Sequence, residues 1–147
     1  MGRLAIVLSI AIPLAAADLL LKAVEPTAPW AYHQRSDSWL LLSLALLAAT
    51  VMVTRIPSSA VPPAAGVLAG GLLGNVLSAT WNGMAVPNPL VVTGDQSVVA
   101  FNLADVWALT GIFLLMAAIA VWLVRNRELL PDTAQARTAF RKARRRL

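Results

Sequence analysis

Four apolar segments, each close to the length that crosses a lipid bilayer, limit what this chain can fold into. A helix of about 20 mostly apolar residues crosses ~30 Å of hydrocarbon, and the segments cover residues 4–24, 38–56, 59–80 and 103–124. Proline-containing stretches at residues 26–29, 56–58 and 87–89 separate them and indicate loops. We therefore expect an all-α integral membrane protein, a four-transmembrane-helix bundle with a small extracytoplasmic loop region.

Two sites inside the apolar segments carry proline. Pro13 lies in the first segment and Pro62-Pro63 in the third. Membrane helices tolerate proline because neighbouring groups satisfy the freed carbonyls. We expect both helices to be kinked at these positions.

The composition agrees with a membrane protein and excludes several classes. Charged residues make up 13% of the chain and hydrophobic ones 59%, whereas a soluble domain has about 25% charged residues. The chain has no cysteine, which excludes a disulfide framework, a thiolate metal site and lipid attachment to its own cysteine. We expect no metal and no cofactor.

The positive charge of the chain is concentrated in its last residues. From Arg127 onward there are seven basic and two acidic residues, and this segment accounts for the whole net charge of +5. We therefore divide the chain into a membrane domain, residues 1–126, and a basic cytoplasmic tail, residues 127–147. Such a tail orients a membrane protein and attracts anionic lipid. Phe140 is its only aromatic residue, so nucleic-acid binding is disfavoured and membrane lipids are the expected partners.

The distribution of basic residues predicts the orientation. Arg3, Arg55 and the tail are separated by even numbers of segments, so all three face the cytoplasm under the positive-inside rule. Both termini are then cytoplasmic, and Arg35 is the exception on the outer side. The tryptophans agree, with one near the inner interface and four near the outer one: Trp122 inside, and Trp30, Trp39, Trp81 and Trp107 outside.

The first segment has an alternative interpretation. Arg3, an apolar stretch and Ala15-Ala16-Ala17 also resemble a cleavable signal peptide. Cleavage would leave three spans in the same orientation. Asp18 and Lys22 favour a first segment that is not cleaved, because two such polar side chains are better explained by partners inside a helix bundle.

Polar side chains from three segments fall at a similar depth near the outer side. They are Asp18, Lys22, Asn75, Asn102 and Asp105. Each costs free energy in hydrocarbon unless it is satisfied, so the clustering indicates a shared site. Two simpler explanations stay open: a purely structural network, and an aspartate favoured at a helix start by the helix dipole. Gly66, Gly70 and Gly74 recur every four residues and predict a helix-packing face.

These polar residues carry a resemblance to a known family. Gly74-Asn75, the run Phe101-Asn102-Leu103-Ala104-Asp105, and Asp18-x-x-x-Lys22 resemble bacterial lipoprotein signal peptidase, or signal peptidase II. That family consists of four-span aspartyl proteases of the bacterial plasma membrane, which cleave prolipoproteins just before a lipid-modified cysteine. The resemblance implies that Asp105 matches the second catalytic aspartate, and that Asn75, Asn102, Asp18 and Lys22 match residues lining or supporting the site.

The chain departs from the family at the first catalytic aspartate. Ungapped counting from Asn75 puts that position on Pro87, and a shift of one residue puts it on Asn88. In the family an Asp-Arg pair follows the Gly-Asn pair after two residues, and here those positions are Ser78 and Ala79. Asp95 is the only acid between Asp37 and Asp105, and it is poorly spaced to substitute. An aspartyl protease needs two carboxylates that share a proton.

Other nucleophiles offer no replacement for the missing acid. Ser36 and Ser38 lie too close to His33 and Asp37 in the sequence to form a triad unaided. A lone histidine in a loop is more often an exposed surface residue.

The leading expectation is therefore a signal peptidase II-like protein without proteolysis. It would bind a lipid-modified or transmembrane-helix ligand, such as a lipoprotein precursor, at an outer-facing groove. Two alternatives stay open. One is an active aspartic endopeptidase using Asp105 and an unrecognised partner. The other is a structural subunit bound to another membrane protein.

Overall fold

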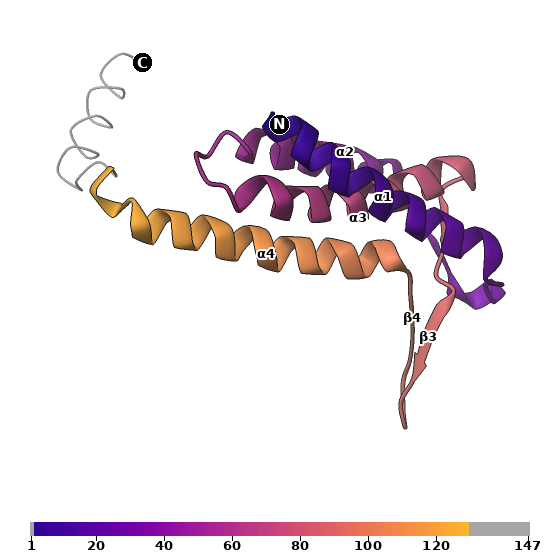
Figure 1. The fold of residues 1–147 in the computed structure, drawn as a ribbon. Coiled ribbons are helices and arrows are strands. Elements are labelled where there is room, and N and C mark those ends of the chain that lie inside the picture. Colours follow the sequence, from indigo (N-terminus) through magenta and orange to yellow (C-terminus); the bar gives the residue numbers. More distant parts are fainter. Residues whose placement is uncertain (1, 130–147) are drawn as a thin grey trace, which may run out of the picture.

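Residues 2–129, which the computed structural model describes, fold into four α-helices and four short strands (Figure 1). The helices are α1 (Arg3–Val24), α2 (Asp37–Val53), α3 (Val61–Trp81) and α4 (Leu103–Arg125). Met1 and residues 130–147 lie outside the described part, and with them most of the predicted basic tail. The mostly helical membrane fold expected from the sequence is confirmed at this level.

Three of these helices have the length and hydropathy of membrane spans. They are α1, α3 and α4, with 22, 21 and 23 residues. α2 is apolar but has only 17 residues, so it is shorter than the predicted second span, residues 38–56. The helices indicate a membrane protein.

α3 is the central helix of the bundle, and α1, α2 and α4 all pack on it. Its glycines allow the neighbouring backbones to approach closely. A Cβ on Gly70 would lie 2.8 Å from Leu14 Cβ of α1, and one on Gly71 would lie 2.5 Å from the carbonyl oxygen of Ala104 in α4. The packing face predicted at Gly66, Gly70 and Gly74 is confirmed, since Gly66 also meets α1.

The prediction of a kink at Pro62-Pro63 is wrong. α3 begins at Val61, so both prolines belong to its first turn rather than to its interior. The N–H groups of a first turn have no intrahelical partner, and proline therefore suits that position. Pro13 does lie inside α1.

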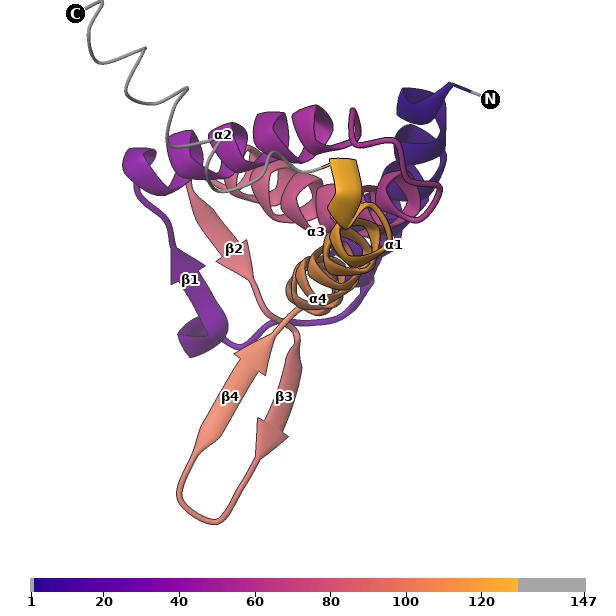
Figure 2. The ribbon, with the colours of Figure 1, turned by 90° about the vertical axis from the view of Figure 1, so that its left-hand side faces the viewer.

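Short strands at one end of the bundle were not predicted. β1 (Tyr32–Gln34) pairs antiparallel with β2 (Ala85–Pro87), and Tyr32 lies opposite Pro87. β3 (Leu90–Thr93) and β4 (Val98–Phe101) form a hairpin that reaches away from the helices (Figure 2). We call this the hairpin end of the bundle. Two single-turn 3-10 helices, η1 (Pro29–Ala31) and η2 (Arg127–Leu129), complete the described elements.

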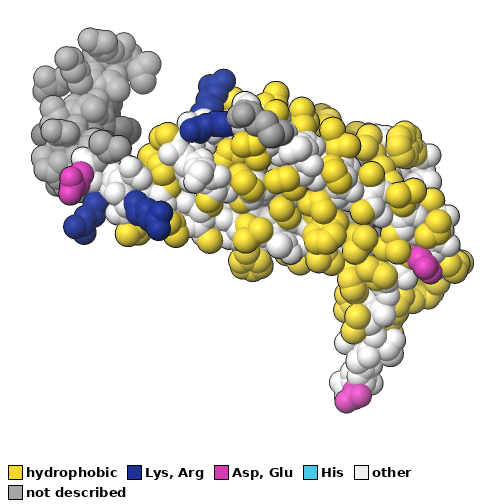
Figure 3. Space-filling model, viewed as in Figure 1, with side chains coloured by type: hydrophobic (Ala, Val, Ile, Leu, Met, Phe, Trp, Pro, Cys, Tyr) yellow, Lys and Arg dark blue, Asp and Glu magenta, His cyan; other side chains and the backbone are white. Residues whose placement is uncertain are grey.

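The opposite end of the bundle is basic. The guanidinium of Arg3 donates to the carbonyl oxygen of Thr54 at 2.7 Å and also to that of Ile56, so the start of α1 lies beside the loop that follows α2. In Figure 3 the exposed cationic side chains gather at this basic end, away from the hairpin. The charge separation that the sequence predicted is therefore present in the described residues.

α2 leaves a gap on one side of the bundle. It packs on α3 but makes almost no contact with α4. In Figure 2 it is seen from the side while α4 is viewed nearly along its axis, so α2 crosses the bundle obliquely. Side chains of α2, α3 and α4 line a groove at this place, with α3 as its floor.

Candidate functional site

The predicted polar side chains of three helices meet in one hydrogen-bonded network at the hairpin end. The ammonium of Lys22 lies 2.7 Å from Asp18 Oδ2 and donates to Asn75 Oδ1 at 3.0 Å. Asn75 Nδ2 in turn donates to Asp105 Oδ1 at 2.9 Å. The predicted clustering of these side chains is thus confirmed, while the roles of these residues stay predictions.

Asp18 ties the first helix to the last. Its side chain is fully buried, and Oδ1 accepts the backbone N–H of Ala104 at 2.8 Å. Ala104 is in the first turn of α4, where N–H groups lack intrahelical acceptors and a negative charge is favourable. Asp18 therefore caps α4 from a neighbouring helix while it neutralises Lys22, as the structural explanation of this pair requires.

Asn102 and Asp105 form a capping box at the start of α4. Asn102 Oδ1 accepts the N–H of Asp105 at 3.0 Å, and Asp105 Oδ2 accepts the N–H of Asn102 at 3.2 Å. Such reciprocal bonds satisfy two orphan donors of a helix start. Asp105 therefore does stabilise the start of a helix, as the simpler explanation expects. Asp105 also faces a cavity, which a purely local cap does not require.

Asn88 belongs to the same network, although sequence reasoning set it aside. It is fully buried, and its Oδ1 accepts a hydrogen bond from Asn102 Nδ2. Its Nδ2 lies 3.0 Å from Nδ1 of His33, so this exposed histidine also contacts the network, which a plain surface histidine would not. The sequence does hold one indication of Asn88: it stands between Pro87 and Pro89, and prolines restrict the backbone on both sides of it. Neither Pro87, the position expected for the family's first acid, nor Asn88, one residue further on, carries a carboxylate.

A cavity of about 250 Å³ lies in the groove between α2 and α4. Leu42 and Leu46 of α2 and Leu72 of α3 give it an apolar lining, and Asp105 and Arg35 give it two charged groups. The sequence singles out Arg35 only as a basic residue on the outer side, an exception to the positive-inside rule. The structure places it half-buried, with its guanidinium 4.9 Å from the centroid of the Trp39 ring.

Other candidate groups are not brought into the site. Asp95 is exposed in the turn between β3 and β4, so it does not pair with Asp105. Ser36 caps α2 by accepting the N–H of Trp39, and His33 bonds Asn88 rather than a serine. Within residues 2–129 no three histidine, aspartate or glutamate side chains are grouped to hold a metal ion.

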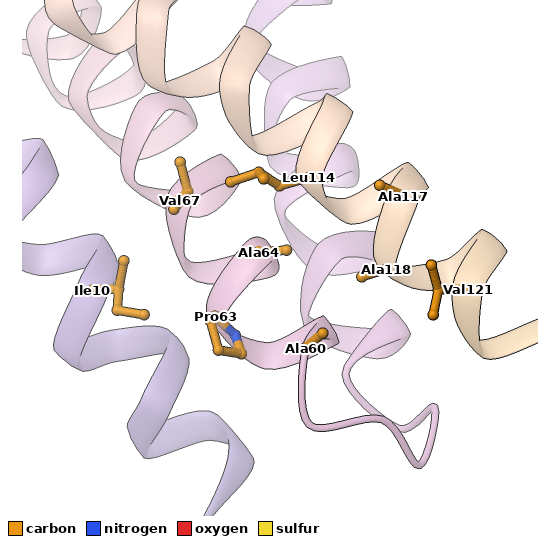
Figure 4. A pocket seen from close by; sticks show the side chains of 9 residues that line it. All are labelled: Ile10, Ala60, Pro63, Ala64, Val67, Leu114, Ala117, Ala118 and Val121. Carbon is orange, nitrogen blue, oxygen red and sulfur yellow. The ribbon is translucent and has the colours of Figure 1, made fainter.

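A larger cavity, of about 420 Å³, lies elsewhere in the bundle. Figure 4 shows the side chains from α1, α3 and α4 that line it, among them Ile10, Ala64 and Leu114. None of the lining residues is charged or carries a polar side chain. The larger cavity therefore has no side chain that could donate or accept a hydrogen bond. The smaller cavity, which has polar side chains, is the better candidate site.

Comparisons of the chain with family models, curated proteins and solved structures gave no match. The resemblance to signal peptidase II therefore depends on the motif residues alone.

Proposed function

We propose that this chain is a signal peptidase II-like protein of the bacterial plasma membrane, which binds a lipid-modified or transmembrane-helix ligand without cleaving it. The observation that carries the proposal is that Asn102 joins one retained carboxylate, Asp105, to the buried neutral amide of Asn88. Both contact Asn102, at the start of α4. The retained polar residues agree with the family resemblance, and the family's first catalytic aspartate is missing from the sequence.

The absence of proteolysis follows from proton chemistry. An aspartyl protease activates water with one carboxylate while the other donates a proton to the carbonyl. Pro87 has no ionisable group, and the Asn88 amide is not an acid. Asp105 alone supplies only half of the required acid–base pair, and among residues 2–129 its carboxylate hydrogen-bonds Asn75 and Asn102 rather than a second carboxyl group.

The groove supports binding of an amphiphilic ligand. Its leucine lining suits an apolar segment, and its charged groups lie toward the hairpin end. Because α2 and α4 scarcely touch, a ligand can enter between them from the lipid. A transmembrane helix or an acyl chain is the kind of molecule that reaches such a groove.

The proposal includes four spans with both termini in the cytoplasm. A 17-residue α2 is about 25 Å long. It begins at Asp37, near the hairpin end, and is followed by Thr54, which contacts Arg3 at the basic end. The contact between Thr54 and Arg3 supports a second span in which α2 and the residues that follow it together reach the basic end.

A cleavage and capture experiment tests the proposal. The purified chain in vesicles should leave a diacylated prolipoprotein uncut, and a photo-crosslinking residue at Leu42 or Leu46 should capture that substrate. Phe113, on the exposed face of α4 and 72% accessible, is the matched control position and should capture little. Cleavage that Asp105→Asn abolishes would establish the active-peptidase alternative instead. Capture equal at Leu42 and Phe113 would remove the groove as the binding site.

A further inference from the structure

The groove between α2 and α4 carries opposite charges that are not paired with each other. Arg35 and Asp105 both line the cavity. Among residues 2–129 the only ion pair within 4.0 Å joins Lys22 to Asp18. The two groups therefore face the same space without an ion pair between them.

Arg35 is held in place but incompletely satisfied. Its backbone N–H donates to Met84 at 2.8 Å, which extends the pairing of β1 with β2. Its guanidinium is held over the Trp39 ring, and its Nε is buried without a hydrogen-bond partner among the described residues. A guanidinium fixed over an aromatic ring presents a planar fork of donors that matches a phosphate group.

Asp105 has acceptor capacity left over. Each of its oxygens accepts one hydrogen bond, from Asn75 Nδ2 and from the N–H of Asn102. A carboxylate has about four lone-pair sites, so roughly two stay free. The nearby ammonium of Lys22 is bonded to Asp18 and Asn75 rather than to Asp105.

We propose that the groove binds an aminophospholipid, with the phosphate on Arg35, the primary ammonium on Asp105 and an acyl chain along Leu42, Leu46 and Leu72. The inference rests on the groove function proposed above, because both require the cavity to accept an amphiphile. A cavity of about 250 Å³ is smaller than the ~300 Å³ or more of a typical ligand site. It therefore holds the headgroup and the first part of a chain, and the remainder lies in the bilayer.

Charge complementarity selects among the common headgroups. A primary ammonium has three N–H donors for the free lone pairs of Asp105, whereas the quaternary ammonium of phosphatidylcholine has none. The glycerol of phosphatidylglycerol brings no positive charge, so it would leave Asp105 facing a neutral group. Phosphatidylethanolamine is the headgroup that meets both charged groups at once.

The test uses the full chain in nanodiscs that contain phosphatidylethanolamine, phosphatidylcholine and phosphatidylglycerol in equal amounts. Native mass spectrometry measures the lipids retained, and a photo-crosslinking residue at Leu42 reports whether they occupy the groove. We expect roughly tenfold retention of phosphatidylethanolamine over phosphatidylcholine, the ratio that one charge-assisted hydrogen bond supplies. Asp105→Asn should abolish this preference, and Arg35→Gln should weaken retention of all three lipids. Asp95→Asn and Arg55→Gln are the matched controls and should change nothing.

The outcomes separate this inference from the groove function. Equal capture of the three lipids at Leu42, or an unchanged preference in Asp105→Asn, overturns the inference and leaves an amphiphile-binding groove. Capture of a diacylated prolipoprotein with no phospholipid also overturns it while supporting the proposed function. Capture of neither at Leu42 overturns both. Circular dichroism of each variant, compared with the unaltered chain, excludes loss of fold as the cause.

Discussion

Asp105 combines two roles at the level of the single residue. It closes the capping box at the start of α4, and it faces the groove beside Arg35. Asn102 connects it to Asn88, so the helix start and the strand segment after α3 are held by one amide side chain. A substitution of Asp105, Asn102 or Asn88 therefore affects both stability and the groove. A control variant has to show which of the two effects is measured.

Asn102→Ala should lower the free energy of unfolding by about 2 kcal/mol, through the lost helix cap and the unsatisfied amide of Asn88. Unfolding in micelles by increasing sodium dodecyl sulfate, followed by circular dichroism, measures the change. Asn82→Ala, which removes a more exposed amide bonded to Ser78, is the matched control and should cost clearly less. Equal losses in the two variants would contradict a special role for Asn102.

The ion pair of Asp18 and Lys22 is best tested by a double-mutant cycle. Asp18→Asn leaves a buried ammonium without its counter-charge and should cost about 3 kcal/mol. Combining it with Lys22→Met removes that ammonium, so the double variant should be less destabilised than the sum of the single ones. The same micelle unfolding measurement applies. Simple additivity would mean that the two charges do not stabilise each other.

At the level of elements, the sequence predicted the helices better than the strands. The ends of the apolar runs predicted the helix ends within about three residues. The pairing of β1 with β2 joins residues more than fifty positions apart, and short segments containing Pro87 carry no local strand signal. That pairing is what positions His33 and Arg35, so these two site residues were missed.

The polar residues on helices were predicted for the opposite reason. A charged side chain in an apolar run costs free energy, so the sequence alone indicates that Asp18, Lys22 and Asp105 have polar partners. Asn88 lies in a loop, where polar residues are ordinary, and only the structure reveals that it is buried.

The close approach of three helices at Gly74 gives a prediction at this level. A Cβ there would lie 2.8 Å from Asp18 Oδ2 and 3.1 Å from Ala104 Cβ. Gly74→Ala should therefore displace Asp18 from the start of α4 and cost about 1–3 kcal/mol, as overpacking does. Gly94→Ala, whose Cβ would meet its nearest atom at 3.4 Å, is the control in the hairpin turn. Thermal unfolding in micelles compares them, and an unaltered midpoint for Gly74→Ala would contradict the packing argument.

The whole molecule is polarised along its helices. One end carries the strands, the groove and the polar network, and the other carries Arg3, Arg55 and Arg125. The proposed function puts this basic end in the cytoplasm, in agreement with the positive-inside rule. A ligand in the groove would then be approached from the outer leaflet, as the proposed function requires.

The same polarity predicts which residues are reachable from each side of the membrane. The chain contains no cysteine, so single-cysteine variants label at one site. Ser38 lies in the first turn of α2 and Ser59 in the loop between α2 and α3, and both are exposed. In intact cells a membrane-impermeant maleimide should label Ser38→Cys and Asp95→Cys, and should label Ser59→Cys only after permeabilisation. Labelling of Ser38→Cys and Ser59→Cys from the same side would mean that α2 does not cross, which would leave the other three helices as the spans.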